Sequence, residues 1–164
     1  MCPLGYRQLV GARFIAPAVP LSCGTTTREG VLELTDFILL LHKYNFYLIV
    51  AAAAISGIWG LVLYFIRRPP IKLWRIILII TVALGVLQGL FGLIMVLSGK
   101  TPGGGKNLYY LHYVYGGIVA LGIPLTWLSF TTNGKNQRKD LLIYSIAALV
   151  LAAAAVRAWM TGPG

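Results

Sequence analysis

The sequence predicts an all-α integral membrane protein, a four-helix bundle with both termini on the outer side. The 164 residues contain four long apolar stretches, each close to the roughly 20 residues of helix that cross a bilayer core of about 30 Å. None of the stretches has the polar stripe at helical spacing that a soluble bundle would show. Basic residues gather in the connections between the stretches, which is typical of the cytoplasmic loops of membrane proteins.

The positive charge of the chain indicates topology rather than nucleic-acid binding. The chain carries 14 Lys and Arg against 4 Asp and Glu, for a net charge of +10. Residues 67–75 and 135–139 are the richest in Lys and Arg, and these two connections lie on one side of the membrane in any four-span chain. Short basic loops stay in the cytoplasm during insertion. We therefore expect a multi-pass protein of a bacterial plasma membrane, with N- and C-termini outside and the lipid bilayer as its surroundings.

The chain divides into two parts. Residues 1–30 hold several Pro and Gly, and we expect this segment to be disordered or to precede the true start of the protein. Residues 31–164 form the predicted four-helix transmembrane domain. Its expected helices cover about residues 36–66, 72–97, 108–130 and 139–160.

Local signals delimit these four helices. The first ends at Arg67-Arg68-Pro69-Pro70, because proline cannot continue the helical hydrogen-bond ladder. The second is followed by the Gly-rich loop 98–107, which lacks the spacing of a phosphate-binding loop. The third contains Pro124, a predicted kink. The fourth follows the polar turn 131–140 and carries Arg157 as the lone charge in its apolar run.

The only two histidines, His42 and His112, head the first and third apolar segments. These two helices run in the same direction across the membrane. His42 precedes the basic Arg67 by 25 residues, and His112 precedes Lys135 by 23. At a rise of about 1.5 Å per residue, their depths differ by only ~3 Å. Histidines within a span suggest function, and this pair predicts axial ligation of a haem b iron.

Other residues are expected on the faces that these helices turn toward a haem. They are Gly85, Gln88, Gly89 and Gly92 on the second helix, Gly116 on the third and Arg157 on the fourth. Glycines there would let a flat macrocycle approach the backbone, and Gln88 could form a hydrogen bond within the bundle. Because haem propionates are anionic, Arg157, Lys100 and Lys106 are their candidate partners.

Each feature also has a structural interpretation. A histidine at a membrane interface can be a polar boundary residue within an aromatic belt. The pair Gly85 and Gly89 fits close helix packing in lipid, and Arg157 could extend to the outer interface. The alternative function is therefore a cofactor-free structural or assembly subunit of a larger membrane complex.

A family resemblance supports the haem interpretation. Residues 86–97, Val-Leu-Gln-Gly-Leu-Phe-Gly-Leu-Ile-Met-Val-Leu, then a loop and Leu111-His112, resemble one half of haem A synthase. Each half of that family is a four-helix unit holding a haem between histidines that head two of its helices. The chain also resembles the cytochrome b561 kind of haem bundle. The resemblance implies ligation by His42 and His112. It does not extend to synthase activity, because residues 37–41 lack the family's acidic residue and no second histidine pair remains.

The sequence thus predicts a membrane b-type haem-binding protein with two axial histidines. Two imidazoles would fill both axial positions of the iron, which favours one-electron transfer over catalysis. The expected partner is a quinol or a larger respiratory or photosynthetic membrane complex. A proton-coupled drug exporter is disfavoured, because the four acidic residues lie outside the spans or at their margins.

Overall fold

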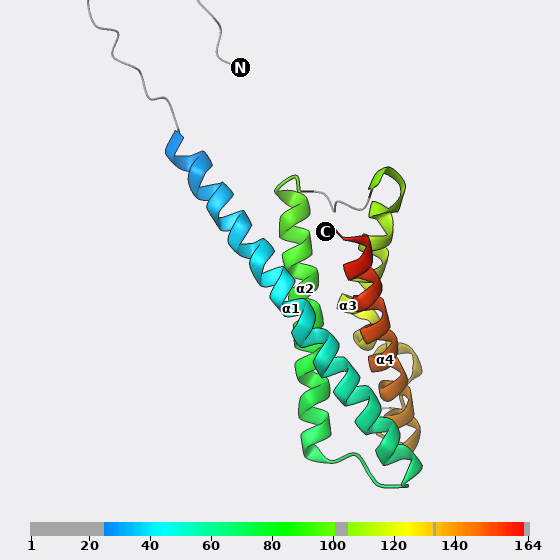
Figure 1. The fold of residues 1–164 in the computed structure, drawn as a ribbon. Coiled ribbons are helices and arrows are strands. Elements are labelled where there is room, and N and C mark those ends of the chain that lie inside the picture. The colour runs from blue at the N-terminus through cyan, green and yellow to red at the C-terminus, as the bar shows by residue number, and fades with distance from the viewer. Residues whose placement is uncertain (1–24, 101–104, 133, 163–164) are drawn as a thin grey trace, which may run out of the picture.

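A computed structural model of the chain describes residues 25–100, 105–132 and 134–162. These residues form four α-helices (Figure 1). The helices are α1 (Thr25–Phe65), α2 (Lys72–Leu97), α3 (Gly105–Phe130) and α4 (Gln137–Thr161). Each helix is long and apolar enough to cross a membrane. The predicted all-helical architecture with four potential membrane spans is therefore confirmed.

The helices extend beyond the ranges expected from hydropathy. α1 begins at Thr25 instead of near residue 36, and α3 begins at Gly105 instead of residue 108. Pro124 lies inside α3, which continues through it. The physical reason for the longer ends is that a helix can leave the bilayer without breaking its hydrogen-bond ladder, whereas hydropathy follows only the part in lipid. Of residues 1–30, which were expected to be disordered or to precede the true start, residues 1–24 fall outside the described residues, whereas residues 25–30 belong to α1.

The four helices form a closed ring of neighbours. α1 packs against α2 and α4, and α3 also packs against α2 and α4, so α1 and α3 lie diagonally opposite. The α1–α2 connection lies at one end of the bundle, together with the last residues of α3 and the first residues of α4 (Figure 1). The end of α2, the start of α3 and the end of α4 lie at the other. The N-terminal part of α1 extends past the other three helices (Figure 1).

The half of the bundle near the α1–α2 connection is tightly packed. A Cβ atom at Gly60 would overlap Ser145 Oγ and lie 2.8 Å from Trp74 Nε1, so only glycine fits there. Trp74 Nε1 donates a hydrogen bond to the Ser56 carbonyl at 2.8 Å. Ser145 Oγ donates to the Leu141 carbonyl at 2.6 Å. The Trp74 and Ser145 polar groups buried in this half thus have hydrogen-bond partners.

The connection between α3 and α4 is held by the buried carboxylate of Asp140. The backbone N–H of Thr132 donates to Asp140 Oδ1 at 2.7 Å, and the N–H of Gly134 donates to Oδ2 at 2.9 Å. The Thr132 hydroxyl donates to the same carboxylate at 2.9 Å. These bonds close the turn and set the start of α4 against α3.

Candidate functional site

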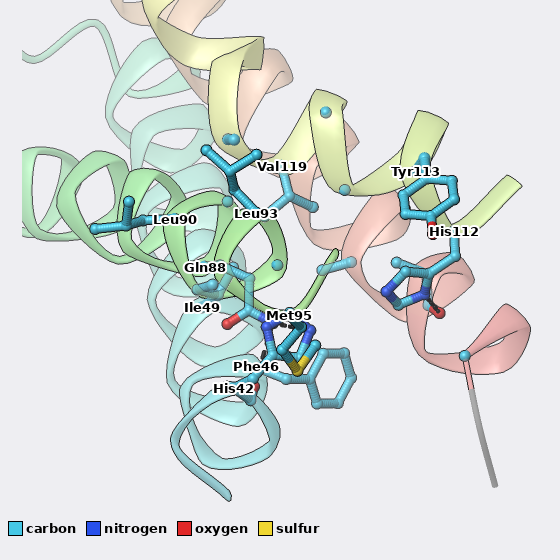
Figure 2. A pocket seen from close by; sticks show the side chains of 18 of the residues that line it. His42, Phe46, Ile49, Gln88, Leu90, Leu93, Met95, His112, Tyr113 and Val119 are labelled. Carbon is cyan, nitrogen blue, oxygen red and sulfur yellow. Dashed lines mark hydrogen bonds between the residues drawn. The ribbon is translucent and has the colours of Figure 1, made fainter. Parts of the chain in front are cut away.

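The two histidines meet across the bundle. His42 comes from α1 and His112 from α3, and their ring centroids are 6.3 Å apart at an interplanar angle of 45° (Figure 2). A metal–imidazole bond is about 2.0 Å long, and the centre of the imidazole ring lies about 1.1 Å beyond the bonded nitrogen. Two imidazoles bound on opposite sides of one metal therefore have centroids about 6 Å apart. The two rings, which the sequence predicted at a similar level, thus lie close together in the fold.

Both histidines border a large cavity between the helices. The cavity has a volume of about 1100 Å³ and mostly apolar walls, with residues from all four helices (Figure 2). Small-molecule and cofactor pockets commonly measure about 300–1,000 Å³. The open half of the bundle is therefore large enough for a drug- or cofactor-sized molecule, and it holds both imidazoles.

His112 is oriented by the backbone of α4. Its Nδ1 lies 2.9 Å from the carbonyl oxygen of Ala158. A carbonyl oxygen only accepts, so Nδ1 carries the ring proton and Nε2 keeps its lone pair. A Cβ atom at Gly162 would lie 3.3 Å from this ring. Metal-ligating histidines usually donate their second nitrogen in this way, which fixes the tautomer and the ring direction.

His42 is held through its other nitrogen. Its Nε2 lies 3.1 Å from Nε2 of Gln88 on α2. An amide nitrogen only donates, so Nε2 of His42 is the acceptor and its Nδ1 carries the proton. Nδ1 is buried and has no hydrogen-bond partner among the described residues. A buried unpaired N–H costs about 1–3 kcal/mol, so this ring is not in its most favourable hydrogen-bonding arrangement.

Asn45 fixes the orientation of the Gln88 amide. Asn45 Nδ2 donates to the Leu84 carbonyl at 3.0 Å and to Oε1 of Gln88 at 2.8 Å. The nitrogen of Gln88 is thereby turned toward α1, where it also donates to the backbone carbonyl of His42 at 3.2 Å. The sequence singled out Gln88, as the only amide in its span, but not Asn45. Asn45 stands three residues after His42, and this helical spacing was the available signal.

Three of the predicted glycines, Gly89, Gly92 and Gly116, border the cavity. Gly92 and Gly116 leave space beside the imidazoles. A Cβ atom at Gly116 would meet no atom of the described residues within 4 Å, and one at Gly92 would meet only Cε1 of His42, at 3.8 Å. These positions therefore leave open space beside the imidazoles.

The other two glycines predicted on α2, Gly85 and Gly89, allow close packing of this helix. A Cβ atom at Gly85 would lie 2.6 Å from the Val119 carbonyl, and one at Gly89 would lie 2.7 Å from Cβ of Ala120. Gly89 also borders the cavity, whereas Gly85 does not. Both residues let α2 and α3 approach closely, which was the structural alternative for this pair.

Arg157 does not reach the cavity. Its side chain is exposed, and the guanidinium carbon lies 6.0 Å from the centroid of the Tyr115 ring. α4 turns this position outward, while Ala158, the next residue, faces His112. The structure thus does not bring Arg157 together with the other predicted site residues.

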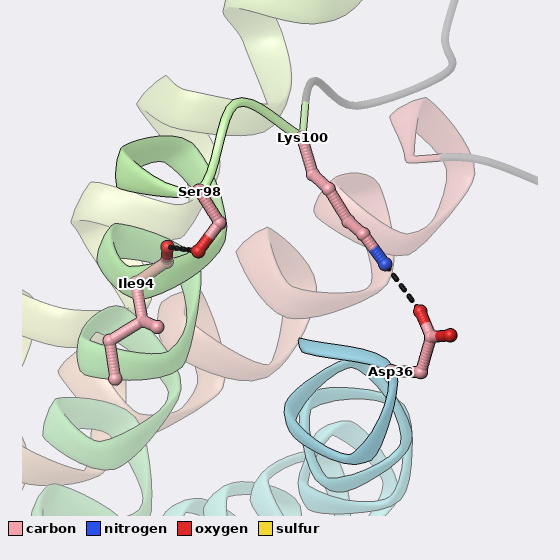
Figure 3. Close-up of polar contacts among 4 residues, drawn as sticks. All are labelled: Asp36, Ile94, Ser98 and Lys100. Atoms are coloured by element: carbon pink, nitrogen blue, oxygen red, sulfur yellow. Dashed lines mark hydrogen bonds and ion pairs between the residues drawn. The ribbon is translucent and has the colours of Figure 1, made fainter. Parts of the chain in front are cut away.

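Two lysines border the cavity instead. Lys100 follows α2 and forms an ion pair with Asp36 of α1 at 2.5 Å (Figure 3). Lys43, next to His42 in sequence, also borders the cavity but was not predicted. The side chain of Lys106 falls outside the described residues. The cavity therefore has cationic groups near its otherwise apolar walls.

Aromatic side chains form another wall of the cavity. Phe46 of α1 stacks on Trp159 of α4, with centroids 4.7 Å apart at 17°. Tyr47 also contacts Trp159, at 5.7 Å between centroids. Of the tyrosines near the histidines, Tyr113 borders the cavity (Figure 2). Sequence analysis missed Phe46 and Trp159, although Phe46 follows His42 by one helical turn.

Protein side chains alone do not complete a metal site here. No group of three or more His, Cys, Asp or Glu in the described part of the chain could hold a metal ion. A metal between the two imidazoles would need its remaining ligands from a bound molecule.

Comparison of the chain with protein-family models, with curated proteins and with solved structures gave no match.

Proposed function

We propose that this protein binds haem b between its helices, with His42 and His112 as axial ligands, and transfers single electrons within the membrane. The observation that carries the proposal is the 6.3 Å separation of the two imidazoles inside an apolar cavity of about 1100 Å³. A porphyrin would supply the four in-plane ligands that the protein lacks, and two imidazoles would fill the axial positions.

The residues around the cavity fit such a group. The lone pair of His112 Nε2 is available because its Nδ1 is committed to the Ala158 carbonyl. Gly92 and Gly116 leave space for a flat macrocycle, which any side chain there would reduce. Lys43 and Lys100 border the cavity and are suitable partners for two propionates.

The chain would orient and insulate the bound group. Haem supplies a one-electron redox centre, whose potential depends on its ligands and on burial. The hydrogen bond from His112 to Ala158 orients one ligand and fixes its tautomer. The stacked rings of Phe46 and Trp159 exclude water from one side. With both axial positions occupied, the chemistry favoured is electron exchange with a quinol or with a neighbouring respiratory or photosynthetic complex.

The resemblance of residues 86–112 to half of haem A synthase supports the same ligands. It extends through Gln88 and Gly92 of α2 to His112 of α3, all of which border the cavity. The proposal takes from it ligation and not synthase activity, because only one histidine pair exists.

An absorbance spectrum is the direct test of haem binding. The purified protein, oxidised and then reduced with dithionite, is expected to show a Soret band and the low-spin bands of a six-coordinate b-type haem. His42→Ala and His112→Ala should each lose the low-spin spectrum, while the control Tyr44→Phe, at an exposed position outside the cavity, should keep it. A colourless protein from haem-replete cells, or two histidine variants with wild-type spectra, would refute the proposal.

The same proposal includes an orientation in a bacterial plasma membrane, with both termini and the histidine end of the bundle outside. It is supported by the basic connections, which hold Arg67, Arg68 and Lys135 and lie at the other end of the bundle (Figure 1). In cells, and with Cys2 and Cys23 replaced by serine, a cysteine introduced at Ser98 should react with an impermeant thiol reagent, and one at Lys135 should be protected. The reverse pattern would invert the orientation.

One observation favours the alternative, a cofactor-free subunit of a larger membrane complex. The N-terminal part of α1 extends past the bundle and exposes Leu34, Phe37 and Leu40. These side chains are available to a helix of another subunit. A colourless protein that co-purifies with a large complex would support this function over haem binding.

A further inference from the structure

The two histidines are held in opposite ways. His112 donates Nδ1–H to the Ala158 carbonyl, so its ligating nitrogen remains available. In His42 the ligating nitrogen itself, Nε2, accepts a hydrogen bond from Gln88, and Nδ1–H is buried without a partner among the described residues. One imidazole is therefore ready to bind a metal, whereas the other has to leave an existing hydrogen bond first.

Gln88 is a fixed donor and not a side chain that happens to lie nearby. Its Oε1 accepts from Asn45 Nδ2 at 2.8 Å, and Asn45 is itself buried and bonded to the Leu84 carbonyl. Its Nε2 donates to both the backbone carbonyl and the ring of His42. A donor held from two sides loses little side-chain entropy when it binds the ring, so it competes effectively for the Nε2 lone pair.

The space around the rings is unequal in the same sense. A Cβ atom at Gly92 would meet only Cε1 of His42, at 3.8 Å. A Cβ atom at Gly162 would lie closer to the other ring, at 3.3 Å from both Cε1 and Nδ1 of His112. Both rings border the cavity, but α4 approaches His112 more closely than Gly92 of α2 approaches His42.

We infer that Gln88 competes with iron for Nε2 of His42, which makes His42 a displaceable ligand and opens one coordination position to a small neutral diatomic molecule. The inference rests on the proposed haem binding and adds a ligand-binding activity to it. In the exchange, Nε2 of His42 would keep the electron pair of its bond to the iron and would accept the Gln88 N–H. The diatomic molecule would supply its own lone pair in place of that of His42. No proton or electron is transferred in this step.

Carbon monoxide binding to the dithionite-reduced protein tests the inference. The wild-type protein is expected to bind carbon monoxide at a rate that levels off at high ligand concentration, because His42 has to leave first. His42→Ala should bind without such a limit. Gln88→Leu removes the hydrogen bond that stabilises the departed ring, and one hydrogen bond corresponds to a rate reduction of about five- to tenfold. Gln88→Val provides a second apolar variant with the same expected effect.

Leu87→Val is the matched control, since Leu87 is on the same helix but is exposed, does not border the cavity and forms no hydrogen bond to His42. It should retain the wild-type rate. A low-spin haem spectrum with no reaction toward carbon monoxide overturns the inference and leaves the proposed function standing. Unchanged rates in both Gln88 variants overturn the role of Gln88. A protein without any haem spectrum overturns the proposed function itself, and with it the inference.

Discussion

Gly116 offers a sharp test of whether the cavity holds a flat cofactor. It lies four residues after His112 and therefore about 6 Å farther along α3, on the same face. A macrocycle between two rings whose centroids are 6.3 Å apart would pass beside it. A flat ring needs about 3.5 Å between its plane and the nearest carbon, and Gly116 has that space because it lacks a side chain. Leucine at this position would occupy it.

Gly116→Leu is expected to leave the haem-free protein at least as stable as the wild type but to weaken its affinity for haem. Gly116→Leu should not destabilise the protein without cofactor, because a Cβ atom there meets no described atom within 4 Å. Replacing a helical glycine adds about 0.5–1 kcal/mol of stability. Overpacking against a bound macrocycle costs about 1–3 kcal/mol, which is a loss of about 5- to 150-fold in haem affinity.

The assay is titration of the haem-free protein with haem, followed at the Soret band, together with its thermal unfolding. Gly122→Leu is the control on the same helix, since Gly122 does not border this cavity and a Cβ atom there makes an ordinary contact of 3.7 Å with Ile118. The control should keep the wild-type affinity. If folded Gly116→Leu binds haem as tightly as the wild type, the assignment of the cavity is wrong.

Three further predictions concern the stability of the bundle, measured as the midpoint of unfolding when dodecyl sulfate replaces a mild detergent. Gly60→Ala should destabilise the protein by about 1–3 kcal/mol, because its Cβ would overlap Ser145 Oγ and crowd Trp74; an unchanged midpoint would mean that α1 and α4 are farther apart. Asp140→Asn should cost about 1–3 kcal/mol, because the amide loses an acceptor for the N–H groups of Thr132 and Gly134; a neutral effect would argue against this closure of the α3–α4 turn. Asp36→Asn should change stability by less than about 1 kcal/mol, because the ion pair with Lys100 is largely exposed, and a larger loss would show that it anchors α1.

The sequence was sufficient to predict the number and order of the helices. Lipid offers no hydrogen-bond partners to the backbone, so an apolar stretch of bilayer length has to be helical. The common level of His42 and His112 also followed from the sequence, because residues count directly as depth along a helix. Helix ends were less predictable, as at Thr25 and Gly105, since polar residues outside the lipid neither require nor forbid another turn.

The rotation of each helix about its axis was decided only by tertiary packing. The spacing of the three glycines on α2 predicted that they share one face. In the structure, Gly85 and Gly89 pack against α3, whereas Gly92 lies beside His42 at the cavity. Hydropathy cannot make this distinction, because lipid and an apolar cavity favour the same side chains. The outward direction of Arg157 was hidden for the same reason.

The difference in hydrogen bonding between the two histidines could also be seen only in the folded chain. The sequence shows two similar residues, each at the head of an apolar helix. Which nitrogen of each ring is engaged depends on groups 46 residues away in sequence, Gln88 for His42 and the Ala158 carbonyl for His112. A hydrogen bond requires atoms at a set distance and angle, and only the packing of α2 against α1 and of α4 against α3 creates these.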